Sequence, residues 1–411
     1  MPNLLSVSKA LDKLLGAFHP VDYEQVELTR ALGRVLAEDV HAGFDLPSFD
    51  NSTMDGFAFR SVDVIGASRE HPISLRVIAD ILAGHPYSGV LSRGQAARIM
   101  TGAPLPGGAD AVIPLEDTDA ANQRVGEPAP VQVQIYRSVQ AGDYVRTHGK
   151  DARAQELLLP CGTRLRPQEV GLLAMLGLPE LKVYRRPRLA ILPTGDELTS
   201  VGEPLAPGKI YESNTYALTA QVEQTGGEVI TFGLIADQLD AVKDALDRAV
   251  EANVDLILAS AGVSVGTYDF VRAAVELGGK LSFWRVNMRP GKPFAFGIYR
   301  GTPFIGLPGN PASSFVGFEI FVRPAVLMMA GQKDWSRAKI PVILQEKVES
   351  DGRESYLRAV VTFRDGRSYA RLTGHQDSGN LRSLIQANAL LIIPNEVKCL
   401  PIGSEVQAWL L

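Results

Sequence analysis

Apolar and polar positions alternate in blocks between residues 188 and 330. Short apolar runs predict buried strands at 189–193, 229–235, 254–258, 281–286, 294–296 and 304–307. Apolar residues spaced by three or four predict helices at about 214–225, 239–250 and 270–277, and one that begins at Asn310 and Pro311. This alternation is typical of a doubly wound, mostly parallel sheet.

The flanking regions follow other patterns. Two helices are predicted near the N-terminus, over 4–18 and 28–36, from apolar residues at helical spacing. Short β-like runs at 73–81, 97–100, 111–115 and 131–135 then predict a small β-rich insertion, and a helix is expected at 170–178. After residue 338 the pattern is all-β, with a hairpin signal at 364–367, which favours a small β-barrel or sandwich.

We therefore predict a multidomain α/β protein with three regions. Residues 1–180 form an N-terminal helical and β-rich region with an inserted subdomain at about 47–140. Residues 181–330 form the α/β domain, and residues 331–411 form a C-terminal β-barrel.

One polar segment of the N-terminal region, 45–60, looks too broken for a strand or a helix. Its apolar residues Phe49, Met54, Phe57 and Phe59 predict an ordered loop anchored by these side chains. Asp55 in this loop either satisfies turn amides or contacts a metal or ligand, and the residues alone favour the turn.

Bulk composition excludes several classes of protein. The chain of 411 residues is 45% hydrophobic and 21% charged, as in soluble globular proteins. A net charge of −5 argues against a general nucleic-acid binder. Two cysteines cannot build a thiolate metal cluster or a disulfide framework. No run of 18 apolar residues and no signal-peptide pattern is seen, so we expect a cytoplasmic protein without a membrane span.

Candidate chemistry lies where the predicted strands end. Asp196 and Glu197 follow one strand, Asp237 follows the next, and the small-residue loop 259–266 with Asp269 follows the third. Open α/β sheets bind ligands at this edge, and small-residue loops between strand and helix present backbone N–H groups to anions.

Cations accompany these acids. The segment 285–293 contributes Arg285, Arg289 and Lys292, and the turn Pro308–Pro311 ends the last strand. Carboxylates for a hard cation beside a cationic strip predict a Mg²⁺-assisted phosphate or oxyanion site.

The motifs taken together resemble the molybdopterin molybdenumtransferase family, called MoeA in bacteria, which includes the E domain of gephyrin. The resemblance is carried by DNSTMDGFA at 50–58, MTGAPLP at 100–106, the turn 149–151, PTGDEL at 193–198, ASAGVSVGTYDF at 259–270, RPGKPFAFG at 289–297, GLPGNPAS at 306–313 and TGHQDS at 373–378. The matches run in the family's order over nearly the whole chain. Related adenylyltransferases share only the middle domain.

The resemblance implies a homodimeric enzyme of molybdenum cofactor biosynthesis with a molybdopterin-binding middle domain. Such an enzyme inserts molybdate into adenylylated molybdopterin and releases AMP with the help of Mg²⁺. Its active sites are shared between the two subunits, and neither nucleic acid nor a membrane takes part. The alternatives are a molybdopterin adenylyltransferase, or a gephyrin-like scaffold, which the absence of a long linker or fused enzyme domain disfavours.

Site residues follow from the motif positions and the strand ends. The expected catalytic residues are Glu197, Asp269, Asp55 and Asp151, and the expected metal ligands are Asp237, Glu197 and Asp269. The expected substrate-binding residues are Thr101, Ser260, Gly262, Ser264, Gly266, Arg285, Arg289, Lys292, Pro308, Pro311, Arg358 and Ser378. Bacterial relatives often have Lys at positions 285 and 289, where this chain has the planar, bidentate guanidinium of Arg.

Overall fold

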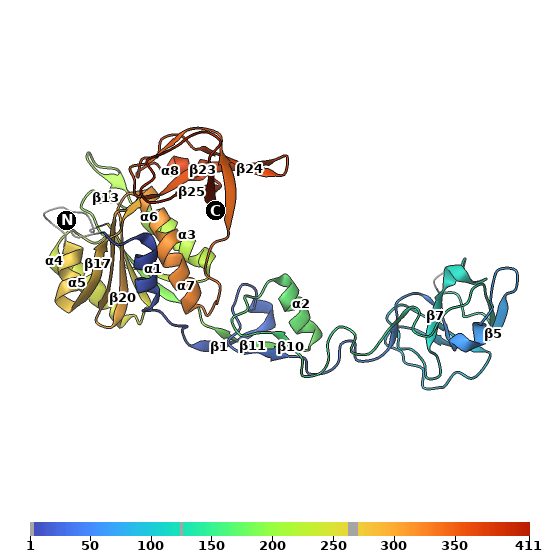
Figure 1. Ribbon diagram of the computed structural model, residues 1–411. Coiled ribbons are helices and arrows are strands. Elements are labelled where there is room, and N and C mark those ends of the chain that lie inside the picture. Colours follow the sequence, from blue (N-terminus) through green and yellow to red (C-terminus); the bar gives the residue numbers. More distant parts are fainter. Residues whose placement is uncertain (1–3, 124–125, 262–269) are drawn as a thin grey trace. The chain divides into compact units, whose positions relative to one another are not determined.

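The computed structural model describes residues 4–123, 126–261 and 270–411 (Figure 1). The chain divides into two compact units. The first comprises the residues up to Glu38, 161–170 and 179–411, and the second comprises 39–160 and 171–178.

The first unit is built on a six-stranded mixed sheet. Its strands, in spatial order, are β15 (Glu228–Thr231), β12 (Arg188–Pro193), β16 (Leu256–Ser260), β20 (Thr302–Leu307), β19 (Pro293–Tyr299) and β17 (Gly279–Arg285). The first four strands are parallel, and β19 and β17 add antiparallel pairings. The prediction of a mostly parallel sheet is confirmed for the strands that carry the acidic loops.

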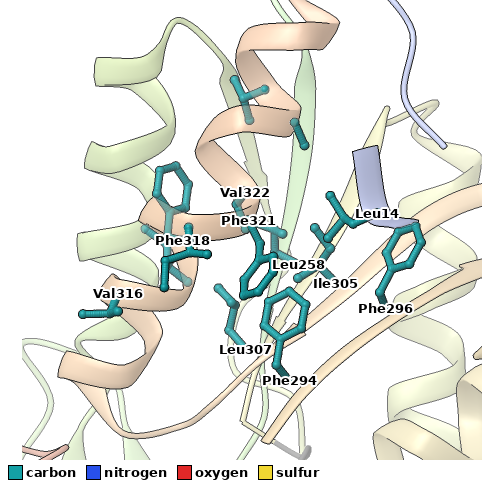
Figure 2. Close-up of a cluster of buried hydrophobic side chains, with 14 of the residues drawn as sticks. Leu14, Leu258, Phe294, Phe296, Ile305, Leu307, Val316, Phe318, Phe321 and Val322 are labelled. Atoms are coloured by element: carbon teal, nitrogen blue, oxygen red, sulfur yellow. The ribbon is translucent and has the colours of Figure 1, made fainter. Parts of the chain in front are cut away.

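Helices cover both faces of this sheet, as the doubly wound prediction requires. Alternate side chains of each strand enter opposite cores: Leu189 and Ile191 of β12 face one layer, and Ala190 and Leu192 face the other. The first layer holds α1 (Val7–Leu15), α3 (Asn214–Thr225), α6 (Pro311–Gly317) and α7 (Arg323–Met329), and the second holds α4 (Leu239–Glu251) and α5 (Phe270–Gly278). Figure 2 shows the first core, where Phe294 lies against Phe321 at a ring-centroid distance of 4.2 Å.

Helix α6 continues through a π-helical turn at Phe318–Val322 into α7. This helix, Pro311–Met329, is long and apolar enough to cross a membrane by length and composition, but 83% of its apolar 18-residue stretch is buried inside the protein. It is therefore a core helix whose apolar surface is used for packing.

A closed five-stranded barrel forms the C-terminal part of the first unit. The strands β23 (Glu354–Arg364), β24 (Arg367–Leu372), β21 (Lys339–Leu344), β27 (Glu405–Leu410) and β25 (Ala389–Ile393) follow one another around it, and β25 closes onto β23. The barrel prediction is thereby confirmed. The tight turn between β23 and β24 has positive φ at Asp365 and Gly366, which is the geometry of the predicted hairpin. Strands β22 (Val348–Glu349) and β26 (Cys399–Leu400) pair separately, and α8 (Leu381–Gln386) precedes β25.

One predicted helix of the first unit does not form. Strand β1 (Tyr23–Glu27) pairs with β11 (Glu180–Tyr184), and a single 3₁₀ turn covers Leu28–Arg30. The predicted helix over 28–36 is wrong, because the N–H groups of Leu36 and Ala37 donate to the carbonyls of Thr163 and Lys182 instead of to the preceding turn.

The second unit is built on a five-stranded sheet. Its order is β7 (Ala111–Pro114), β4 (Gly56–Phe59), β6 (Gln95–Ile99), β5 (Ile73–Ile81) and β8 (Gln132–Ile135), which confirms the four predicted runs. The smaller elements of this unit are β2 (Val40–His41) with β10 (Leu157–Leu159), β3 (Asn51–Ser52) with β9 (Val145–Arg146), and 3₁₀ turns at Ser61–Val64 and Leu115–Asp117. Helix α2 (Pro167–Met175) spans the boundary between the two units in sequence.

The expected loop at 45–60 is partly wrong. Phe57 and Phe59 are fully buried, but they lie in strand β4, between β7 and β6. Phe49 and Met54 are 45% and 37% exposed, so they do not anchor the segment.

Candidate active site

Three carboxylates gather at the carboxyl edge of the central sheet. Asp196 and Glu197 follow β12, and Asp237 follows β15, the neighbouring strand. The backbone N–H of Asp237 donates to Asp196 Oδ1 at 3.2 Å. Burial raises the pKa of Asp237, and the negative charges of Asp196 and Glu197 raise it further. The acids repel one another electrostatically, so a cation placed among them would be stabilised.

The end of β16 meets the turn Pro308–Pro311. Ser260, the last residue of β16, is 1% exposed, and Ala261 after it has a φ of 88°, in the left-handed region. The Ala261 N–H donates to the carbonyl of Leu307 at 3.1 Å. A Cβ on Gly309 would lie 3.1 Å from Ala261 Cβ, so the turn lies against the end of β16.

Side chains from two other elements hold this turn. Asn214, at the start of α3, donates through Nδ2 to the Gly309 carbonyl at 2.8 Å. Asn310 is the N-cap residue of α6, but its side chain makes no capping bond and donates instead to Ser378 Oγ at 2.8 Å. The Ala312 N–H donates to the Ser378 carbonyl at 3.0 Å. These hydrogen bonds therefore connect Ser378 of the barrel to the turn that contains Pro308 and Pro311.

Arg358 of β23 lies behind the Ser378 loop. Its side chain is fully buried, and it donates to Ser383 Oγ and to the carbonyls of Gln376 and Asp377 at 2.9, 3.3 and 2.9 Å. Burial lowers the pKa of Arg358, and the nearby charge of Arg289 lowers it further. With its donors directed to the protein, the guanidinium acts on the loop that carries Ser378.

The cationic strip connects the sheet to the barrel. Arg285 ends β17 at the carboxyl edge and is exposed, as is Lys292. Met288 and Arg289 form β18, which pairs in parallel with the start of β23 at Glu354 and Ser355. Arg289, which is half-buried, therefore lies where the barrel adjoins the strip.

In the second unit, the predicted residues Asp55 and Thr101 are hydrogen-bonded to each other. Asp55 Oδ1 accepts from both the N–H and the Oγ1 of Thr101, each at 2.7 Å. Asp151 pairs with Arg146, and its own N–H donates to the Leu46 carbonyl at 2.8 Å.

Four predicted residues, Gly262, Ser264, Gly266 and Asp269, lie outside the described residues. Within the described ranges, no three His, Cys, Asp or Glu residues are arranged as a complete metal site.

Family comparisons agree along the whole chain. Three family models match: the MoeA N-terminal region (domain I and II) over residues 5–177, a probable molybdopterin binding domain over 190–327, and the MoeA C-terminal region (domain IV) over 341–411. The chain is 41% identical over 392 residues to the molybdopterin molybdenumtransferase of Nostoc sp., covering 94% of this chain and 88% of the relative. It belongs to the molybdopterin molybdenumtransferase family.

Other molybdopterin molybdenumtransferases and a solved structure agree with this membership. The Bacillus subtilis enzyme is 37% identical over 394 residues, covering 94% of this chain and 90% of the relative. A crystal structure of a molybdopterin biosynthesis MoeA protein from Pyrococcus horikoshii covers 100% of both chains with a TM-score of 0.84 and 32% identity. The chain is thus a transferase of molybdenum cofactor biosynthesis that handles molybdopterin and molybdate.

The sequence did not reveal the residues that hold the turn 308–311 and the loop 376–378 in place. Asn214, Gln376 and Ser383 were not among the expected site residues. Ser213 is the N-cap residue of α3 but makes no side-chain capping bond, and the carboxylate of Glu212, one position earlier, accepts from the Thr215 N–H at 2.8 Å. A polar residue that serves a distant backbone carbonyl leaves no periodic signal in the sequence.

Proposed function

We propose that the chain inserts molybdenum from molybdate into adenylylated molybdopterin and releases AMP, in a Mg²⁺-assisted reaction in the cytoplasm. The observation that carries this proposal is the carboxylate group Asp196, Glu197 and Asp237 at the sheet edge. It adjoins the ends of β12 and β15, next to β16, whose last residue is Ser260. Anionic substrates at such an edge need a cation beside these acids.

The donor chemistry suits Mg²⁺. This ion prefers oxygen ligands, and proteins commonly hold it through one or two carboxylates together with substrate phosphate oxygens. A partial set of acids at the edge is consistent with such a shared shell, and Asp269 is the further ligand expected from the sequence. When bound, Mg²⁺ would neutralise charge on the phosphoanhydride that is cleaved.

The protein's own residues would bind and position the substrates. Arg285, Arg289 and Lys292 would raise the local concentration of oxyanions. The turn 308–311, held by Asn214 and Ser378, would fix the backbone beside Ser260. We place Gly262, Ser264 and Gly266 in substrate binding as well, from their motif positions.

We further propose a homodimer in which each active site combines Glu197 of one chain with Asp55 of the other. The support is the resemblance, together with the fixed geometry of Asp55, which holds Thr101 through two hydrogen bonds. Asp151 would belong to the same contributed surface.

Mixing two inactive variants tests the shared site. Asp55→Asn and Glu197→Gln homodimers are dissociated and reassembled together, and mass measurement establishes that mixed dimers form. About half of the dimers are then mixed, each with one intact site, so roughly a quarter of wild-type activity returns by symmetry counting. If both residues served a site within one chain, no activity would return.

The reaction itself is tested by AMP release. Adenylylated molybdopterin is incubated with the protein and Mg²⁺, with and without molybdate, and AMP is quantified. We expect release that depends on both molybdate and Mg²⁺. Formation of adenylylated molybdopterin from ATP and molybdopterin would instead support the adenylyltransferase alternative, and specific retention of a receptor peptide without AMP release would support the scaffold.

A further inference from the structure

A second cationic cavity lies at the other end of α3. Helix α3 begins beside the turn 308–311 and ends at Thr225, roughly 18 Å away for twelve residues rising 1.5 Å each. Beside Thr225 is a cavity of about 190 Å³. Its polar and charged lining residues are Arg164, Gln224, Thr225, Glu319, Arg323 and Arg337.

The cavity carries more positive than negative charge. Three arginines line it with one acid, Glu319. Glu319 is 5% exposed, and both of its oxygens are engaged: Oε2 accepts from Arg337 Nε at 2.8 Å, and Oε1 accepts from Gln221 Nε2 at 3.0 Å. Only Arg337 is therefore neutralised by a lining acid.

The other two arginines form no ion pair within the part of the chain that the structure describes. Arg323 Nη1 donates to the Trp335 carbonyl at 3.1 Å, and Arg164 makes no side-chain hydrogen bond or ion pair with the residues that the structure describes. Asp334 lies near Arg323 but does not line the cavity, and its Oδ1 accepts from Ser336. Burial lowers the pKa of Arg323, and the charges of Arg337 and Arg164 lower it further, while the charges of Glu319 and Asp334 act in the opposite direction.

Two further observations restrict the kind of ligand that this cavity can bind. The cavity is below the roughly 300 Å³ at which pockets for drug-sized ligands begin, so it suits a compact ion better than a nucleotide or a pterin. Glu319 lies in the π-helical turn Phe318–Val322, and such turns occur frequently at functional sites.

We infer that this cavity binds a compact tetrahedral oxyanion of the phosphate, sulfate or molybdate type, separately from the site at the sheet edge. Guanidinium groups contact such anions through paired N–H donors, and a dianion would neutralise the charge of Arg164 and Arg323. The neighbouring cavity shares Arg164, but its Arg34 and Arg185 are already paired with Glu24 and Asp255.

Titration calorimetry of the full chain with phosphate, sulfate and molybdate at low ionic strength tests the inference. We expect saturable binding and a loss of affinity of at least about tenfold in Arg164→Gln/Arg323→Gln, the change expected when about 1.4 kcal/mol of charge-assisted contact is lost. The exposed Arg30→Gln removes the same kind of charge elsewhere and is the matched control, which should bind like the wild type. Competition among the three anions identifies the preferred occupant.

The inference is overturned if no saturable binding occurs, or if the double variant binds each anion as tightly as Arg30→Gln. In either case the arginines would serve only to neutralise the carbonyl end of α3. If circular dichroism shows that the double variant is unfolded, Arg164→Gln alone carries the test, because its exposed side chain holds nothing together among the described residues.

Discussion

Arg358 offers the sharpest test of how the barrel serves the active site. Replacing it with Met keeps an apolar stem and removes every donor, whereas Lys keeps the charge but cannot reproduce the planar fork. If the guanidinium works by holding the loop 376–378, both variants should release Ser378 from Asn310 and Ala312.

The size of the effect follows from opposing contributions to the free energy of unfolding. Two bonds of 2.9 Å from a charged donor would stabilise the fold by about 3–6 kcal/mol, at about 1.5–3 kcal/mol each. Burial of the guanidinium without an ion-pair partner among the described residues opposes this, and the lowered pKa of Arg358 has burial as its main cause. We therefore expect Arg358→Met to lower the free energy of unfolding by a net of about 1–3 kcal/mol.

Three measurements on the same variants decide the matter. Denaturant unfolding gives the stability, hydrogen exchange at the Ala312 amide reports the release of the Ser378 loop, and AMP release is followed against molybdate concentration. We expect faster exchange and a higher half-saturating molybdate concentration in both variants. Arg185→Met breaks the ion pair with Asp255, before the first residue of β16, and is the control that should lose stability without a change in molybdate dependence. An Arg358→Lys protein with wild-type exchange and molybdate dependence would refute the positioning role.

Further predictions concern the sheet edge and its cations. Glu197→Gln should lower Mg²⁺-dependent AMP release by about 10²-fold, the scale of losing one preorganised electrostatic contact, with unchanged circular dichroism; wild-type turnover would remove Glu197 from the mechanism. Arg289→Ala should weaken the molybdate response more than Arg289→Lys, and equal damage would show that guanidinium geometry matters more than charge. Because folding raises the pKa of Asp237, the stability contributed by its protonated form is fully present below the usual pKa of 3.8 and is lost as pH rises through the folded value. Asp237→Asn should therefore melt about 1–2 °C higher than the wild type at neutral pH without Mg²⁺, and a difference that grows as pH falls below 4 would contradict this sign.

Much of the architecture could be predicted because it is encoded locally. The run Ile73–Ile81 is rich in apolar residues and became strand β5 with the same bounds. The edge acids could be found for the same reason, since locating the end of β12 also locates Asp196 and Glu197.

The errors arose where distant partners decide the local structure. Residues 28–36 have helical spacing, but the backbone N–H groups of Leu28, Gly33 and Leu36 donate to carbonyls more than a hundred positions away. In β4 the residues Gly56–Phe59 are all buried, so the strand shows no alternation of polar and apolar positions. The roles of Asn310 and Arg358 depend on the meeting of the sheet edge and the barrel, which no local pattern encodes.

Strand β18 gives the barrel a property familiar from peptide-binding domains. Strand β24 pairs with β23 only from Ala359 onward, and β18 occupies the backbone edge of β23 at Glu354 and Ser355. The barrel thus recognises residues 288–289 by strand addition, with a ligand supplied by its own chain. Covalent attachment makes this association intramolecular, so two residues of pairing suffice where a free peptide would need a longer match. An external extended peptide that paired with this edge of β23 would compete with residues 288–289 for the same backbone groups.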